Sequence, residues 1–325
     1  MKRLPLQSFL AQQIQDYLSF QAVAGRRSTC YDVSIYSFDR YCAKKHPDAT
    51  ELTQDIANQW FRKRDTETNN SCRARSNGVK SFIRYLRKRG LSNVQDPILP
   101  KRENCTYIPH AFINDELQNF FCECDNIPKA GIYTQPRISR SRQITVPVFF
   151  RLLYSTGMRP VEARTLLRTD VNLNDGVISI RRSKGDEQHF VVMHDIMNAV
   201  MKEYDEAIEK IYPDRTYFFP ANSDSYYSDK WVDENFKLCW YKRNHSYATT
   251  YDLRHNYATE NINRWICCGF DFLDKLLALS KSMGHVSLEN TKYYYSLVPA
   301  LANILQDRTL QSFNEIVPEV QYEIE

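Results

Sequence analysis

Two arginines and a run of tyrosines in the C-terminal two thirds of the chain have the side chains needed to cut a phosphodiester bond. The arginines are Arg159 and Arg254, and the tyrosines are residues 293–295, which follow Gly284 and His285. Two arginines can hold a phosphate through paired hydrogen bonds and stabilise charge on its non-bridging oxygens. A tyrosine can attack phosphorus and keep the cleaved end as a covalent ester. These residues therefore predict a phosphodiester-cutting site that conserves bond energy for rejoining DNA.

Five separated elements occur in a fixed order: Arg159 with Glu162, then Lys184, then the segment 251–255, then Gly284-His285, and finally Tyr294, nine residues after His285. In this order and spacing the chain resembles the tyrosine recombinase (phage integrase) family over roughly residues 145–300. The resemblance implies two sets of site residues. The catalytic set is Arg159, Lys184, Tyr251, Arg254, His285 and Tyr294, and the supporting set is Glu162 and His255. Lys184 is expected to protonate the leaving 5′ oxygen from a hairpin tip.

One position departs from the family pattern, because Tyr251 stands where histidine is usual. A phenol with a pKa near ~10 can donate a hydrogen bond to phosphate but is a poor base at neutral pH. The phosphate environment is then expected to activate Tyr294, with His255 or His285 accepting its proton. Neighbours on a helix lie ~100° apart, so only one tyrosine of the run can face the site, and the spacing from His285 selects Tyr294.

The composition is that of an ordinary soluble globular chain with room for two domains. The 325 residues are 42% hydrophobic and 25% charged, and no apolar run approaches the ~18 residues of a membrane span. We therefore expect no membrane partner and a cytoplasmic location, near the nucleoid of a prokaryote if the resemblance holds. The nine cysteines have no zinc-ligand spacing, which predicts reduced thiols and neither a metal nor a cofactor.

Positive charge is concentrated in the N-terminal third. Residues 1–105 hold 19 Lys and Arg against 10 Asp and Glu, whereas the rest of the chain holds 24 against 29. Several basic clusters in one short domain predict a surface that displaces counterions from DNA phosphates, although any single cluster could be a solvated helix face. The residues predicted to bind DNA are Arg73, Arg75, Lys80, Arg84, Arg87 and Lys88.

Apolar spacing predicts a mainly α fold with a small antiparallel β-sheet. Residues 1–92 read as a helical bundle, which resembles the core-binding domain of integrases; its clearest helix buries Val79, Phe82, Ile83 and Leu86. Prolines mark a linker over residues 93–110, and residues 111–299 read as an α+β catalytic domain. In that domain we expect one helix from near Pro147 to Gly157, one over 228–241, and others that start at 115, 252 and 271. A hairpin is expected over 177–193.

The sequence therefore predicts a site-specific DNA recombinase that forms a 3′-phosphotyrosyl intermediate. A type IB-like topoisomerase and a catalytically inactive DNA-binding protein on the same scaffold are the alternatives. The expected partner is double-stranded DNA, bound by a homotetramer on two synapsed duplexes, with accessory DNA-bending proteins possible. Apolar residues in the tail, 300–325, predict a segment that docks on a neighbouring protomer or packs back on its own domain.

Overall fold

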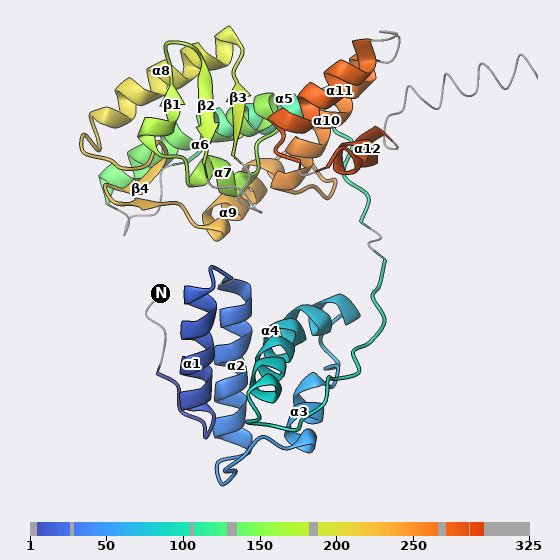
Figure 1. Ribbon diagram of the computed structural model, residues 1–325. Helices are drawn as coiled ribbons and strands as arrows, with labels where there is room; N and C mark the ends of the chain where they lie inside the picture. Colours follow the sequence, from blue (N-terminus) through green and yellow to red (C-terminus); the bar gives the residue numbers. More distant parts are fainter. Residues whose placement is uncertain are drawn as a thin grey trace, which may run out of the picture. The chain divides into compact units, whose positions relative to one another are not determined.

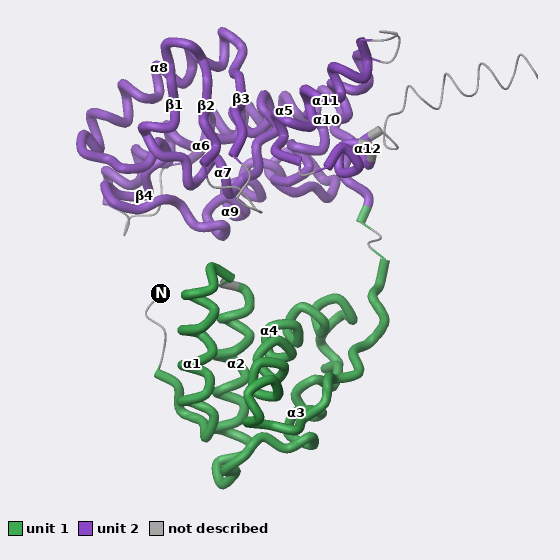
Figure 2. Tube along the Cα trace, viewed as in Figure 1, with its two compact units in different colours: residues 1–107 green, residues 108–325 purple. Residues whose placement is uncertain are grey.

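The computed structural model describes residues 5–26, 29–104, 107–128, 135–181, 188–265, 271–285 and 287–295. The described chain is mostly helical with small antiparallel sheets, which confirms the predicted fold class. It divides into two compact units, residues 1–107 and residues 108–325 (Figure 2). Each unit has its own hydrophobic core, and the two are described separately.

The described part of unit 1 forms a helical bundle (Figure 1). Its helices are α1 (Ala11–Val23), α2 (Thr29–Lys45), α3 (Gln54–Phe61) and α4 (Asn69–Lys88). Thr53 and Thr68 cap α3 and α4 because each side-chain oxygen accepts a hydrogen bond from a backbone N–H of the first turn. The apolar face of α4 is buried as the sequence predicts, with Val79, Phe82 and Ile83 fully inaccessible.

The segment after α4 does not form a free linker over its whole predicted length. Residues 93–104, here called the strap, run back along α4 and bond to it. Arg73 donates to the carbonyl of Pro100, and the Asn70 amide donates to the carbonyl of Glu103. Val94 is buried in the core of the bundle. Burial of Val94 and these hydrogen bonds therefore hold the strap against the bundle, although it forms no regular secondary structure.

Unit 2 surrounds a small sheet with helices (Figure 1). Its elements are α5 (Asn114–Asp125), α6 (Pro136–Thr156), α7 (Pro160–Arg164), a short 3₁₀ turn (Arg168–Asp170), β1 (Val171–Asn172), β2 (Val177–Ile180), β3 (His189–Val192), α8 (Asp195–Glu209), β4 (Pro220–Asn222), β5 (Ser225–Tyr226), α9 (Asp229–Trp240), α10 (Thr250–Trp265), α11 (Asp271–Ser282) and α12 (Glu289–Tyr295). Strands β1, β2 and β3 pair antiparallel in that order. Ile180 faces His189 at the last pair before the hairpin tip, so the predicted hairpin strands are present.

Helix α6 starts earlier than the sequence predicts. Proline favours the first position of a helix, which made Pro147 the expected start, but the helix begins at Pro136 and Pro147 lies inside it. An interior proline costs about 3 kcal/mol, whereas each large apolar side chain buried contributes roughly 1.5–3 kcal/mol. Val146, Phe149 and Phe150 next to Pro147 are all fully buried, so core packing keeps the helix continuous.

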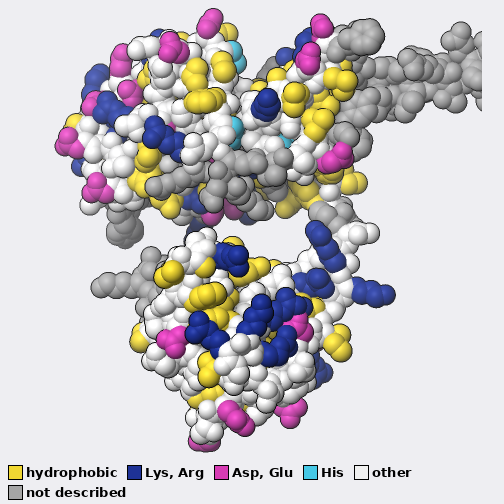
Figure 3. Space-filling model, viewed as in Figure 1, with side chains coloured by type: hydrophobic (Ala, Val, Ile, Leu, Met, Phe, Trp, Pro, Cys, Tyr) yellow, Lys and Arg dark blue, Asp and Glu magenta, His cyan; other side chains and the backbone are white. Residues whose placement is uncertain are grey.

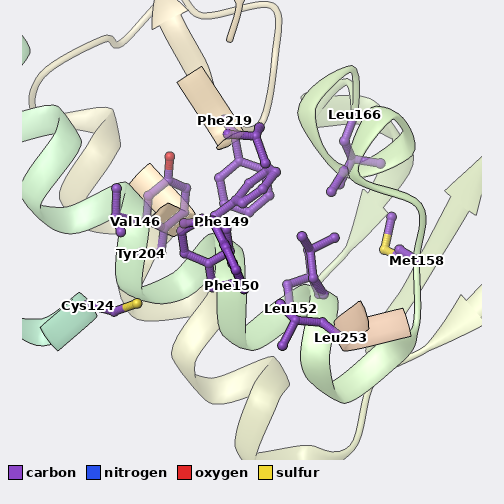
Figure 4. Packing of buried hydrophobic residues seen from close by; sticks show 14 of the residues in the cluster. Cys124, Val146, Phe149, Phe150, Leu152, Met158, Leu166, Tyr204, Phe219 and Leu253 are labelled. Atoms are coloured by element: carbon purple, nitrogen blue, oxygen red, sulfur yellow. The ribbon is translucent and has the colours of Figure 1, made fainter. Parts of the chain in front are cut away.

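Helix α6 contributes Val146, Phe149, Phe150 and Leu152 to the core of unit 2 (Figure 4). The Phe149 ring lies 5.3 Å from that of Phe219, and Phe150 lies 5.4 Å from Phe120, both in edge-on geometry. Leu253 of α10 belongs to the same cluster. The following residue on α10 is Arg254, so this packing fixes the position of a predicted catalytic side chain.

Gly157 ends α6 in the left-handed conformation, with φ of 65°, and a Cβ there would lie 2.3 Å from Cδ1 of Tyr257. We expect Gly157→Ala to lower the free energy of unfolding by about 3 kcal/mol or more, because the left-handed strain of about 1–2 kcal/mol adds to displacement of the tyrosine. Gly176→Ala is the matched control, since Gly176 has φ of 66° and its nearest neighbour would lie at 3.5 Å. Urea titration compares the two, and equal losses would contradict the steric account.

Candidate active site

Arg254 lies at the centre of the candidate site, near the start of α10, with only 1% of its surface exposed. Its Nη1 donates to the carbonyl of Gly157 at 2.6 Å and its Nη2 to the carbonyl of Met283 at 2.7 Å. Burial lowers the pKa of the guanidinium, but an arginine stays charged in proteins. The structure therefore holds one positive charge in place at the junction of α6, α10 and α11.

Arg159 occupies the N-cap position of α7 and reaches the same junction. Its Nη1 donates to Oε1 of Glu162 at 2.6 Å, and its Nη2 donates to the carbonyl of Gly284 at 2.8 Å. Glu162 is buried and also accepts from the backbone N–H of Arg159 at 2.9 Å. Glu162 thus orients Arg159, and the two arginines bond to carbonyls of the adjacent residues Met283 and Gly284.

Both ring nitrogens of His285 are engaged. Nε2 lies 2.9 Å from Nη2 of Arg254, and Nδ1 lies 2.7 Å from Oγ1 of Thr291. Because a guanidinium can only donate, Nε2 must accept, and the ring proton resides on Nδ1, which donates to Thr291. Burial, followed by the charges of Arg254 and Arg159, lowers the pKa of His285 to about 4. The imidazole is therefore neutral at neutral pH.

Tyr294 packs into this site from α12, with 4% of its surface exposed. Its ring is stacked on His285 with 5.8 Å between centroids and lies 5.3 Å from His255. Burial raises the pKa of the Tyr294 phenol, while the charge of Arg254 acts in the opposite direction. The phenol is consequently protonated in the resting protein and needs a base before it can attack.

The neighbouring tyrosines are placed differently. Tyr293 is 46% exposed, and the side chain of Tyr295 lies outside the described residues. Tyr251 is 43% exposed, with its ring 5.4 Å from that of His255. The structure thus brings Arg159, Glu162, Tyr251, Arg254, His255, His285 and Tyr294 together. Lys184, predicted at the hairpin tip, lies outside the described residues.

Reasoning from sequence missed His189, which lies on β3. Its ring packs against Gly284, where a Cβ would lie 2.5 Å from Cε1 of His189, and it is the smallest of the influences that lower the pKa of His285. Gly284 therefore permits the close approach of β3 to the turn that carries the site. The position of His189, five residues after the predicted catalytic Lys184, was the signal available in the sequence.

Among the described residues, no group of three histidine, cysteine, aspartate or glutamate side chains has a geometry that could hold a metal ion. The part of the chain that the structure describes also contains no helix long and apolar enough to cross a membrane.

The residues predicted to bind DNA lie on or near α4 of unit 1, where lysines and arginines gather on one face (Figure 3). Asp96 of the strap pairs with three of them. Its carboxylate accepts from Nε of Arg84 at 2.8 Å and Nη2 of Arg87 at 3.0 Å, and Lys80 Nζ lies at 3.5 Å. The Arg84 guanidinium is the main cause that lowers the pKa of Asp96 to about 2. Three cations around one carboxylate leave an excess of positive charge on an exposed face.

Arg75 has a different environment from the other predicted DNA ligands. It forms an ion pair with Glu67, donates to the carbonyls of Trp60 and Arg62, and places its guanidinium 4.9 Å from the centre of the Trp60 ring. Its side chain is 13% exposed. These contacts are internal to unit 1, so we assign Arg75 to the stability of the bundle and no longer propose it as a phosphate ligand.

We expect Asp96→Asn to strengthen binding of duplex DNA and to steepen the log–log salt dependence by about one, because it frees cations that the carboxylate neutralises. Asp48→Asn is the control, since it changes the net charge equally at an exposed residue between α2 and α3. Fluorescence anisotropy over a salt series measures both. Identical effects of the two variants would show that only net charge matters.

Known proteins resemble this chain in sequence. Residues 123–300 match the sequence profile of the Phage integrase family. The protein named integrase/recombinase y4rB of Sinorhizobium fredii is 24% identical over 309 residues, covering 90% of this chain and 95% of that protein. The tyrosine recombinase XerC of Staphylococcus saprophyticus is 25% identical over 199 residues, covering 60% of this chain and 59% of XerC.

Solved structures share the fold. XerH recombinase bound to its difH substrate matches with a TM-score of 0.57 and 17% identity, covering 82% of this chain and 76% of XerH. The Tn1549 transposon integrase in complex with transposon right end DNA matches with a TM-score of 0.58 and 14% identity, covering 92% of this chain and 99% of that one. A lambda integrase tetramer bound to a Holliday junction matches with a TM-score of 0.57 and 14% identity, covering 88% of this chain and 76% of the lambda integrase chain. The profile match spans more than half of the chain. This chain belongs to the phage integrase family of tyrosine recombinases.

Proposed function

We propose that this protein is a site-specific DNA recombinase that cuts and rejoins DNA through Tyr294. The observation that carries the proposal is the convergence of Arg159 and Arg254 on the carbonyls of Gly284 and Met283, beside the buried Tyr294 phenol. Two fixed guanidiniums form an anion site, and a nucleophile next to it matches the needs of in-line attack on phosphorus.

In the proposed reaction the Tyr294 oxygen attacks the scissile phosphorus and the bond from phosphorus to the 5′ oxygen breaks. The product is a 3′-phosphotyrosyl ester with a free 5′-hydroxyl. Arg254 has an Nε–H that is buried and has no hydrogen-bond partner among the described residues, which makes it a donor for a non-bridging oxygen. Hydrogen bonds aimed at charge that develops in the transition state are the largest contribution to such catalysis.

Two further roles rest on the family resemblance. We assign Lys184 as the acid that protonates the leaving 5′ oxygen, from the loop between β2 and β3. Tyr251, at the position where histidine is usual, is assigned as a hydrogen-bond donor to the phosphate, because a phenol can donate such a bond. Its 43% exposed side chain is accessible to a bound DNA strand.

The proposed partner is double-stranded DNA, contacted by both units. The exposed cations Arg84 and Lys88 on α4 support a role of unit 1 in backbone binding. By likeness to the lambda integrase tetramer we propose a homotetramer on synapsed DNA, coupled by residues 300–325, which lie outside the described residues. Accessory DNA-bending proteins and action on the nucleoid of a prokaryote are part of the same proposal.

The second candidate is a catalytically inactive DNA-binding protein on the same scaffold. The replacement of the usual histidine by Tyr251 is the observation that favours it. A type IB-like topoisomerase would share the covalent chemistry, and it differs by relaxing supercoiled DNA without a defined site.

Covalent trapping tests the proposal. Nicked duplexes tiled across the DNA that flanks the gene, together with a library of duplexes with a randomised core, should yield a protein–DNA adduct that survives denaturation. The adduct should form in excess EDTA, because none of the proposed roles needs a metal ion. Failure of the wild-type protein to form an adduct with either set, while it still binds them, would favour the inactive candidate. Uniform cleavage across the library would favour the topoisomerase.

A further inference from the structure

His255 lies among three tyrosines, one of which is the proposed nucleophile. Its ring centroid is 5.3 Å from that of Tyr294, 5.4 Å from that of Tyr251 and 6.1 Å from that of Tyr293. Resting on the proposed function, we infer that His255 is the catalytic base that takes the phenolic proton from Tyr294.

His285 cannot take the proton, although it stacks on Tyr294. Its Nε2 lone pair accepts from the Arg254 guanidinium, and its Nδ1 carries the proton that Thr291 receives. No lone pair on the ring is left to accept another proton. To act as a base, His285 would have to break its contact with Arg254 and place a second positive charge beside it, which is unfavourable in a buried site.

Tyr251 is also a poor acceptor. It carries the same phenol group as the nucleophile, so passing a proton from one phenol to the other gains no stronger base. A neutral imidazole holds a proton at a pKa near ~6.5 and accepts one during attack. The departure at position 251 therefore moves the proton transfer to the histidine four residues later on the same helix.

His255 is available for that role. The ring is half-buried, and its Nδ1 is inaccessible and has no hydrogen-bond partner among the described residues. Burial is the main cause that lowers the pKa of His255; the charge of Asp252 raises it and that of Arg254 lowers it. The imidazole is therefore neutral at neutral pH and able to accept. The ionisable groups around it are Tyr251, Asp252, Arg254 and Glu260 on α10, Tyr293 and Tyr294 on α12, and His110, which lines a cavity together with His255 and Glu260.

A route for the proton leads away from the reacting atoms. His255 lines a cavity of about 250 Å³ together with His110, Thr259, Glu260 and Asn263. The proton leaves Tyr294 for His255, the phenolate oxygen bonds to phosphorus, and the 5′ oxygen takes its own proton from the acid, assigned above to Lys184. The imidazolium then loses its proton to water in this cavity, whose lining also includes the apolar residues Ile108 and Phe112, and rejoining reverses each step.

The test isolates nucleophile activation from leaving-group protonation. A duplex identified by the trapping experiment is made with sulfur in place of the bridging 5′ oxygen at the cleaved phosphate, so that a thiolate leaves without an acid. Adduct formation by wild type, His255→Ala and His255→Gln is followed across a pH series. His245→Ala, at an exposed histidine outside the site, is the control. Free imidazole and substituted imidazoles of different basicity are then added to each variant.

We expect both His255 variants to form the adduct about 10²–10³-fold more slowly than wild type. The wild-type rate should fall as pH falls through the lowered pKa of His255, because the neutral imidazole is lost there. The rates of both variants should not fall over the same pH range. Added imidazole should restore the rate of adduct formation by His255→Ala, in proportion to the concentration of neutral imidazole. It should leave the rate of the control unchanged. Rescue distinguishes a base from a structural histidine.

Wild-type rates in both variants would overturn the inference, as would slow variants that imidazole does not rescue. Either result could occur while wild type forms its adduct normally, and the proposed function would then stand without this role. Absence of any wild-type adduct removes the proposed function and the inference together.

Discussion

Phenylalanine in place of Tyr294 is expected to abolish the covalent protein–DNA adduct. The substitution removes only the phenolic oxygen, so the ring can keep its stacking on His285 and its place in the cluster with Ala258 and Ile262. No other nucleophile is expected to replace it, and the loss should be complete to the limit of detection. Gel mobility of denatured protein with a labelled nicked duplex measures the adduct, and thermal unfolding should change little.

The neighbouring tyrosines provide matched controls. Tyr293→Phe and Tyr295→Phe make the same chemical change one residue to either side on α12. Tyr293 is 46% exposed, so its variant should form the adduct at close to the wild-type rate. If Tyr294→Phe retained the adduct while one neighbour lost it, the register taken from His285 would be wrong.

Loss of Arg254 should have the second largest effect. We expect Arg254→Ala to slow adduct formation by about 10²–10³-fold or more, because it removes a fixed charge and the Nε–H assigned to a phosphate oxygen. It also leaves the carbonyls of Gly157 and Met283 without their buried donor. Arg254→Lys keeps the charge but cannot donate to both carbonyls in the same plane, so most of the loss should persist.

Arg264 supplies the control for that experiment. It lies in the last turn of the same helix, with its side chain 75% exposed, and forms an i,i+4 pair with Glu260 at 3.9 Å. Arg264→Ala should leave the single-turnover rate within about twofold of wild type, since exposed pairs contribute little. Rates measured at saturating DNA separate chemistry from binding. A normal rate in Arg254→Ala would contradict the role of the buried guanidinium.

The parts of the site that follow from local spacing could be predicted from the sequence. The spacing of nine residues from His285 selects Tyr294 from the run of tyrosines. The structure places the Tyr294 ring on His285 and its phenol near the charges of both arginines. The helix predicted over 228–241 begins after its Ser228 cap, as the structure confirms. These features depend on residues close together in the chain, and the patterns of helix capping and apolar periodicity describe such residues well.

Long-range pairing could not be predicted in the same way. Nothing local to Asp96 indicates that it meets Lys80, Arg84 and Arg87, because that contact depends on how the strap folds back on α4. The contacts of Arg75 within unit 1 could not be predicted for the same reason. A basic cluster has the same sequence whether its side chains face solvent or bond to backbone carbonyls. The start of α6 was missed because burial around Pro147 outweighs its local preference.

The hydrogen bonds of His285 could not be predicted from the sequence either. The sequence leaves His255 and His285 as equal candidates for the proton of Tyr294. The contacts of His285 with Arg254 and Thr291 separate them, because those contacts occupy both of its ring nitrogens.

One measurement tests the central claim most directly. The trapped adduct is digested with protease and nuclease, and the peptide that carries nucleotide is sequenced by mass spectrometry. The account predicts a phosphodiester between the Tyr294 oxygen and the 3′ end of the cleaved strand, with a free 5′-hydroxyl on the other fragment. Attachment to any other residue, or a 5′-phosphoryl linkage, would contradict it.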